Sequence, residues 1–118
     1  MKDALKRAES YSKSGADLIL IHSKENNPKE IFKFAKYFSK SKFYKPLIAV
    51  PSTYSKVTED HLASHGFKVV IYANHLLRAA YPAMQKAAVK ILKKSRSADI
   101  EGDIISIKNI LNIIPNNP

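Results

Sequence analysis

Three apolar segments occur along the chain, and each has a continuous apolar centre instead of strict alternation with polar residues. They cover residues 16–23, 45–53 and 67–74, and their central sequences are LILI, LIAV and VVIY. Runs of this kind are typical of parallel strands that are covered on both faces of a sheet. We therefore expect three buried parallel strands.

Apolar residues at helical spacing mark the segments before, between and after these strands. We expect helices over residues 3–15, 27–40, 57–66 and 75–94. The N-caps expected for the first three are Asp3, Asn27 and Thr58, and Glu30 is placed to complete a capping box behind Asn27. Glycines end the first and third helices, because a glycine adopts the left-handed backbone that commonly follows a helix.

The fourth expected helix contains Pro82, which lacks a backbone donor and would kink or restart it. Residues 95–103 are expected to form a linker, and residues 103–114 a short last helix. We assign residues 1–96 to a partial barrel and residues 97–118 to a linker and C-terminal helix.

Strands that alternate with helices predict an α/β fold with parallel strands and right-handed crossovers. A sheet of three such strands has two open edges, and strands this apolar need neighbours. The chain is therefore expected to be part of something larger, or half of an assembly.

In α/β folds, ligands bind at the carboxyl ends of the strands. The polar residues at the expected strand ends are His22, Ser23, Ser52, Thr53, Asn74 and His75, with Arg78 one turn later. They offer neutral donors, imidazoles and a guanidinium, a set suited to an anionic substrate such as a carboxylate or phosphonate. None of the ten acidic residues ends a strand, and there is no glycine-rich phosphate loop, so we assign no catalytic residue and no metal ligand.

Each strand-end residue also has a purely structural interpretation. Asn74 would cap the following helix, His75 would be an ordinary first-turn residue, and Arg78 would pair with a surface carboxylate or reach a neighbouring subunit. His22 differs, because it directly follows LILI and an imidazole there must find a partner, which favours a role in a site. The histidines expected to face solvent are His61 and His65.

Composition narrows the class of protein. The chain has 118 residues, of which 45% are hydrophobic, so it fits one domain and can bury a core. It has no cysteine, which excludes disulfides and thiolate metal sites. Its first residues lack the apolar core of a secretory signal, and no apolar run approaches the roughly 18 residues that span a bilayer. We expect a cytoplasmic protein that does not interact with membranes.

The net charge of +10 suggests nucleic acid as a partner. Seventeen of the twenty basic residues are lysines spread along the chain, however, and only three are arginines, which suit forked phosphate contacts better. Solvated lysine faces are therefore favoured over nucleic acid. Binding to a polyanion through the lysines is kept as an alternative.

Three stretches carry a family resemblance: ALKRAESYSKSGADLILIHSK, PLIAVPSTY and VIYANHLLRAAYPAMQKAA. They resemble the phosphoenolpyruvate mutase family of the isocitrate lyase/phosphoenolpyruvate mutase superfamily, and YANHLLRA is similar to the mutase and its close relative phosphonopyruvate hydrolase. The resemblance extends from residue 4 to about residue 114. It implies the C-terminal part of a (β/α)8 TIM barrel with C-terminal helices, in a fold that is often tetrameric and exchanges its last helix between subunits.

The resemblance also implies a function. Members interconvert phosphoenolpyruvate and phosphonopyruvate with Mg²⁺, in phosphonate biosynthesis, and the family's metal-binding carboxylates come from earlier strands that have no counterpart here. His22 matches the family's histidine at the phosphoryl end of the substrate, and Ser52, Thr53 and Asn74 match positions that line the barrel mouth.

From this resemblance we expect a fragment of the enzyme that is catalytically incomplete alone. Its expected partners are the small anionic substrate in the complete enzyme and either further copies of the chain or the missing N-terminal half. A phosphonopyruvate hydrolase-like fragment and a non-catalytic oligomerisation module are the alternatives.

Overall fold

The computed structural model describes residues 1–113. The chain divides into two compact units, Met1–Ala73 and Asn74–Pro118. The domain boundary near residue 96, which the sequence suggested, stays a prediction. No helix in the described range is long and apolar enough to cross a lipid bilayer.

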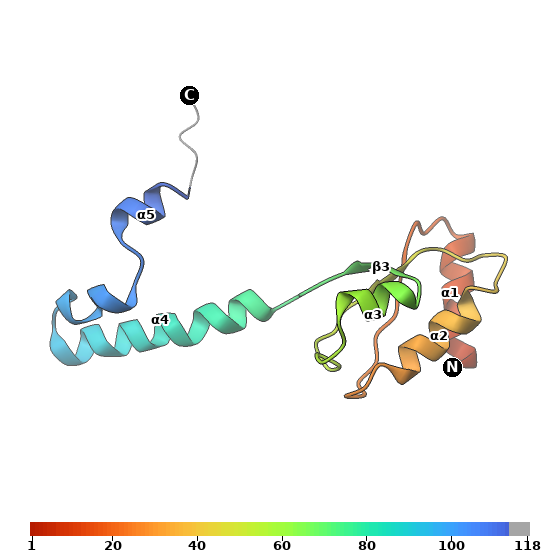
Figure 1. Ribbon diagram of the computed structural model, residues 1–118, viewed down its shortest axis with the longest axis horizontal. Helices are drawn as coiled ribbons and strands as arrows, with labels where there is room; N and C mark the ends of the chain where they lie inside the picture. The colour runs from red at the N-terminus through yellow and green to blue at the C-terminus, as the bar shows by residue number, and fades with distance from the viewer. Residues whose placement is uncertain (114–118) are drawn as a thin grey trace, which may run out of the picture. The chain divides into compact units, whose positions relative to one another are not determined.

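The first unit contains a sheet of three parallel strands in the order β1-β2-β3, which confirms the strands expected from the sequence. The strands are β1 Ile19–Leu20, β2 Leu47–Ala49 and β3 Phe67–Val70 (Figure 1). These strands are shorter than the apolar segments of the sequence. Beyond their ends, the neighbouring segments are joined only by isolated backbone hydrogen bonds. The N–H of Ile71, for example, donates to the carbonyl of Ala49 at 2.9 Å.

Both outer strands leave one backbone edge open among the described residues. On β1, the N–H groups of Ile19 and Ile21 donate to the carbonyls of Pro46 and Ile48, at 3.0 and 3.3 Å. Since N–H groups alternate in direction along a strand, the N–H of Leu20 points to the open edge. An open edge of this kind is a template for pairing with a further strand.

Three helices of the first unit, α1 Lys2–Lys13, α2 Lys29–Phe38 and α3 Glu59–Ser64, pack with the sheet (Figure 1). The core between helices and sheet is apolar and almost free of solvent contact. Its largest fully buried side chains are Tyr54, Phe34, Phe38, Ile31, Leu47 and Leu62. Helical spacing places the four buried residues of α2 on one face, so this helix contributes much of the core.

The opposite face of the sheet is not covered by the elements of the first unit. In one row of the register, Leu20 lies beside Ile48 and Ile48 beside Val69. Leu20 is 51% exposed and Val69 is 38% exposed, whereas Ile19, Leu47 and Phe67 in the preceding row are buried. The expectation that both faces are covered is therefore wrong for this unit, and we call Leu20, Ile48 and Val69 the open row.

The predicted ends of α1 and α3 are partly confirmed. Thr58 caps α3, and its hydroxyl oxygen accepts from the N–H of His61 at 3.2 Å. Asp3 is not the N-cap of α1, because Met1 occupies that position; Asp3 lies in the first turn, where a negative charge still favours the helix dipole. The glycines after both helices have left-handed backbones, with φ of +99° at Gly15 and +90° at Gly66.

The start of α2 differs from the predicted capping box. Pro28 occupies the N-cap position, and the Asn27 side chain accepts from the N–H of Lys29 at 3.1 Å. Glu30 does not return to the backbone; its carboxylate accepts a hydrogen bond from the hydroxyl of Ser23. The carboxylate predicted to cap a helix therefore ties the helix to the loop after β1.

The second unit contains α4 His75–Lys94, the 3₁₀-helix η1 Ala98–Asp103 and α5 Ile107–Leu111. Helix α4 has the predicted bounds and continues through Pro82, so of the two predicted effects of Pro82 the restart is wrong and the kink stays a prediction. The expected linker contains η1, whose Asp103 pairs with Lys86 and Lys90 of α4 at 3.2 Å. The pKa of the Asp103 carboxyl is lowered by hydrogen bonds from both lysines, and the bond from Lys90 has the larger effect. The end of the predicted last helix lies outside the described residues.

Replacing Phe38 with Ala should lower the free energy of unfolding by about 3–5 kcal/mol, because the buried ring would leave a cavity in the core. The neighbouring Tyr37 is 48% exposed, so Tyr37→Ala should change it by only about 0.5 kcal/mol. Urea unfolding followed by circular dichroism measures both values. Equal losses in the two variants would contradict the placement of α2.

Candidate functional site

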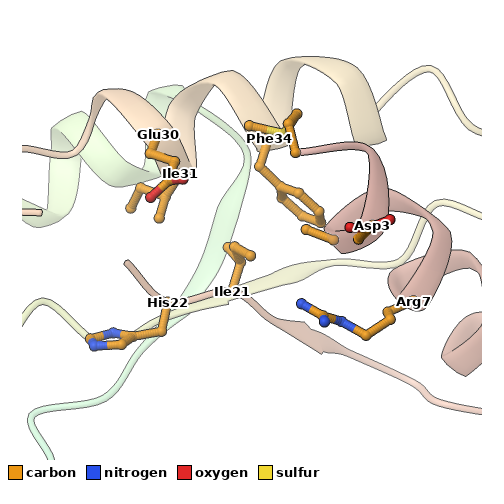
Figure 2. Close-up of a pocket in the computed structure, with 9 residues that line it drawn as sticks. Asp3, Arg7, Ile21, His22, Glu30, Ile31 and Phe34 are labelled. Atoms are coloured by element: carbon orange, nitrogen blue, oxygen red, sulfur yellow. The ribbon is translucent and has the colours of Figure 1, made fainter. Parts of the chain in front are cut away.

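A cavity of about 320 Å³ opens beside the carboxyl end of β1. Its walls come from the start of α1, from Ile21 and His22 at the end of β1, and from α2. Arg7 and Asp3 contribute charges from α1, and Glu30 contributes one from α2. The predicted site residue His22 therefore lines a real cavity, as Figure 2 shows.

The side chains in this cavity do not converge on one point. Ile21 points toward α2, while the His22 ring points away from Arg7 (Figure 2). Charges of both signs line the space, since Asp3 and Glu30 accompany Arg7. The side chains that line this cavity therefore do not form an anion-binding site by themselves. Arg7 was not identified from the sequence; the only signal was its place one turn after Asp3 on the expected first helix.

The loops after β1 and β2 are tied together by side chains. The hydroxyl of Ser23 donates to the Glu30 carboxylate and accepts from the N–H of Glu25, the latter at 3.2 Å. The hydroxyl of Thr53 donates to the carbonyl of Ser23 at 2.7 Å. We call these bonds the loop tie. It uses the only donor of the Thr53 side chain and fixes the residue that follows His22.

Tyr54 directly follows Thr53, a residue of this tie. Its side chain is only 1% exposed, and its ring centroid is 6.2 Å from that of His22. Burial raises the pKa of the Tyr54 hydroxyl, and the nearby backbone of Val50 offsets this only partly, without the geometry of a full hydrogen bond. A neutral tyrosine ring therefore supports the loop next to His22.

The imidazole of His22 remains exposed. Neither of its ring nitrogens has a hydrogen-bond partner within residues 1–113, and its described ring contact is with Tyr54. The alternation of side chains along a strand places His22 on the same face as Leu20, two residues earlier. His22 therefore presents a free donor and acceptor next to the open row.

The other predicted site residues have separate surroundings. Ser52 lies in a tight turn in which its N–H donates to the carbonyl of Val50 at 2.8 Å. Asn74 belongs to the second unit, where it holds the N-cap position of α4 without a side-chain capping bond, and His75 is the first residue of that helix. The structure thus brings together His22, Ser23, Thr53 and Tyr54. The substrate-binding roles of His22, Ser52, Thr53 and Asn74 stay predictions.

No group of three or more His, Cys, Asp or Glu side chains in the described part of the chain could hold a metal ion. Mg²⁺ needs oxygen ligands, mainly carboxylates. The described residues therefore do not fit a magnesium site, and no chemical step can be assigned to such an ion on these residues.

Within the first unit, a parallel sheet with helices on one face and polar groups at its carboxyl ends is the arrangement found in one sector of an α/β barrel. Residues 1–92 match the family model described as phosphoenolpyruvate phosphomutase. The chain belongs to the phosphoenolpyruvate phosphomutase family.

Two curated relatives show how much of their own length this chain matches. The phosphoenolpyruvate phosphomutase of Tetrahymena pyriformis is 37% identical over 113 residues, which are 96% of this chain and 37% of the relative. The phosphonopyruvate hydrolase of Variovorax sp. (strain Pal2) is 33% identical over 113 residues, which are 95% of this chain and 38% of that protein. The chain therefore spans little more than a third of the relatives it matches.

Solved structures agree with this coverage. The phosphoenolpyruvate phosphomutase of Streptomyces platensis subsp. rosaceus superimposes with a TM-score of 0.82 at 34% identity, over 95% of this chain and 38% of its own. A phosphonopyruvate hydrolase in complex with oxalate and Mg²⁺ gives a TM-score of 0.81 at 33% identity, over 95% and 39% of the two chains. These matches confirm the partial-barrel fold that the sequence predicted.

The Tyr54 hydroxyl should make stability depend on alkaline pH. Because folding raises its pKa, its stabilising contribution is complete below the ordinary value of 10.0 and is lost as the pH rises through the folded value. Tyr54→Phe should therefore lose less stability than the wild type above pH 10.0, and should change it by no more than about 1 kcal/mol at neutral pH. Urea unfolding across this range measures the difference. The same slope against pH in both proteins would contradict a buried neutral hydroxyl.

Proposed function

We propose that the chain forms part of the substrate-binding wall of a phosphoenolpyruvate mutase-type enzyme, which interconverts phosphoenolpyruvate and phosphonopyruvate in phosphonate biosynthesis. The observation that supports this most is the exposed His22 imidazole at the carboxyl end of β1, held by the loop tie. Enzymes with parallel α/β sheets place their substrate contacts at this end of the strands.

In this proposal, His22 donates a hydrogen bond to an oxygen of the phosphoryl group. Phosphoryl transfer depends mainly on positioning and on stabilising charge, and a fixed donor aimed at the phosphoryl oxygens does both. The loop tie reduces the freedom of the backbone next to the imidazole, so less entropy is lost when substrate binds. Ser52 and Thr53 would line the mouth of the site, and the role of Asn74 stays the expectation from the family resemblance.

The carboxylates for Mg²⁺ would come from segments that the longer relatives possess and this chain does not match. When bound, the ion would neutralise negative charge on the substrate. The residues described here would contribute binding and orientation only, so we infer that they are catalytically incomplete by themselves. The expected cytoplasmic location stays a prediction.

Hydrolysis of phosphonopyruvate is the alternative reaction. The match to the Variovorax hydrolase supports this alternative, because its 33% identity to the chain is close to the 37% identity of the Tetrahymena mutase. The two reactions differ in whether water attacks the phosphoryl group of phosphonopyruvate. The described residues around His22 do not include a group that would exclude or admit this water. The product, phosphoenolpyruvate or pyruvate with phosphate, separates the two.

An interaction module is a second candidate function, and the open row favours it. Parallel sheets are normally covered on both faces, and here one face with two open edges is uncovered within the first unit. The partner proposed is either another copy of the chain or the remaining part of a barrel. Either would bury the open row and pair the free backbone of β1.

The isolated chain should show no turnover of phosphonopyruvate with Mg²⁺ above the buffer rate, because its described residues cannot hold the ion. Mixing it with the part of the Tetrahymena relative that it does not match should restore turnover. His22→Ala should then reduce the restored rate at least about tenfold, as expected for loss of a charge-stabilising donor. A coupled assay for each product measures the rates.

Lys33→Ala is the matched control, since Lys33 is exposed on α2 and does not line the cavity beside β1. Turnover by the isolated chain at the rate of a complete relative would contradict the proposed division of the site.

Leu20→Glu should reduce self-association of the chain, because it places a charge in the open row. Tyr37→Glu alters a residue of similar exposure on α2, 48% against 51%, and should leave association unchanged. Light scattering after size-exclusion chromatography measures the mass. Self-association through the open row would be ruled out if the wild type were a stable monomer with the same mass as Leu20→Glu.

A further inference from the structure

Two histidines lie together on the surface of the first unit, away from the cavity at β1. His61 lies on α3 and His65 is its C-cap residue, four positions later. Residues spaced four apart on a helix share one face, and the two ring centroids are 4.9 Å apart. Both side chains are exposed, as the sequence predicted.

Phe32 of α2 holds both rings in place. Its ring stacks on His65 with centroids 3.8 Å apart and planes 12° apart, and its centroid is 4.9 Å from that of His61. Phe32 is itself packed against the core. Packing of this kind restricts the rotation of both imidazoles before any ligand binds, which lowers the entropic cost of binding.

The hydrogen bonding of His65 leaves a nitrogen available for a metal. Its Nδ1 lies 2.9 Å from the carbonyl oxygen of His61. A carbonyl can only accept, so Nδ1 carries the proton and the lone pair of the neutral ring lies on Nε2. Histidines that bind metals commonly have this arrangement, with the second nitrogen donating to a backbone carbonyl. The ring nitrogens of His61 have no hydrogen-bond partner in the described part of the chain.

We propose that His61 and His65 form a site for one divalent transition-metal ion such as Cu²⁺, Ni²⁺ or Zn²⁺. Imidazole suits these ions, whereas Mg²⁺ prefers oxygen. With metal–nitrogen bonds of about 2.0–2.1 Å, two imidazoles on one ion have centroids roughly 4–6 Å apart, a range that includes the distance found here. Water completes the coordination, because no third His, Cys, Asp or Glu joins the pair among residues 1–113.

This site is independent of the proposed enzyme function. Binding would connect the last turn of α3 to its C-cap and, through Phe32, to α2. An ion that binds only the folded chain stabilises it by an amount that grows with the logarithm of the free ion concentration above the Kd. The site would therefore act as a metal-dependent clamp on the end of α3.

The test is isothermal titration calorimetry of the untagged full chain with ZnCl₂ and, separately, CuCl₂ in a non-chelating buffer. We expect one ion per chain, and binding weakened at least about tenfold in both His61→Ala and His65→Ala. His22→Ala removes an exposed imidazole elsewhere and should bind the ion as the wild type does. Unchanged binding in the two pair variants, or equal weakening in His22→Ala, would overturn the proposal.

A second measurement needs no substitution. Cu²⁺ should broaden the amide NMR signals of residues 58–66 and of Phe32 in the wild-type chain first, because a paramagnetic ion affects nearby nuclei. Broadening that begins elsewhere would overturn the site. So would a doubling of the mass in light scattering with ZnCl₂, since the ion would then bridge two chains.

Discussion

The structure of the first unit depends on one constraint, which is that the helices of this unit cover only one face of its parallel sheet. The helices α1, α2 and α3 bury Ile19, Leu47 and Phe67, while the open row of Leu20, Ile48 and Val69 faces away from them. Burying apolar surface is the main favourable contribution to folding, at roughly 25 cal/mol per Å², so an uncovered apolar row forgoes stability. A sector of a closed barrel has this property, because its inner face is covered only by the other strands.

The same constraint explains where the candidate site lies. His22 follows Leu20 by two residues and so belongs to the uncovered face, at the strand end where barrels bind ligands. The loop tie through Ser23, Glu30 and Thr53 fixes the backbone around it without using the imidazole itself. One face of this sheet thus packs on the helices of the first unit, and the other carries the substrate contact and the strand pairing that we propose.

Much of this fold could be predicted from the sequence. The apolar runs located all three strands, and Thr58 and the limits of α4 were predicted correctly because caps and helical spacing are local signals. The prediction that both faces of the sheet are covered was wrong for the first unit. A run such as LILI shows that a strand is apolar but not which elements cover it. Glu30 was misassigned since its carboxylate had a competing donor in Ser23, seven residues away and beyond local rules.

The candidate site was less predictable than the fold. His22 could be named because a polar ring after an apolar run is conspicuous, whereas Arg7 enters the same cavity only through the packing of α1. The pairing of His61 and His65 on Phe32 also depends on tertiary contact between α2 and α3.

The measurement that tests the central claim most directly is amide hydrogen exchange at the open edge of β1. The N–H of Leu20 has no strand beside it among the described residues, so in the isolated chain it should exchange much faster than those of Ile19 and Ile21, which donate to the carbonyls of Pro46 and Ile48. Adding the part of the Tetrahymena relative that this chain does not match should slow exchange at Leu20 specifically. Strong protection of Leu20 in the isolated chain as a monomer, or no change after mixing, would contradict a barrel sector that awaits further strands.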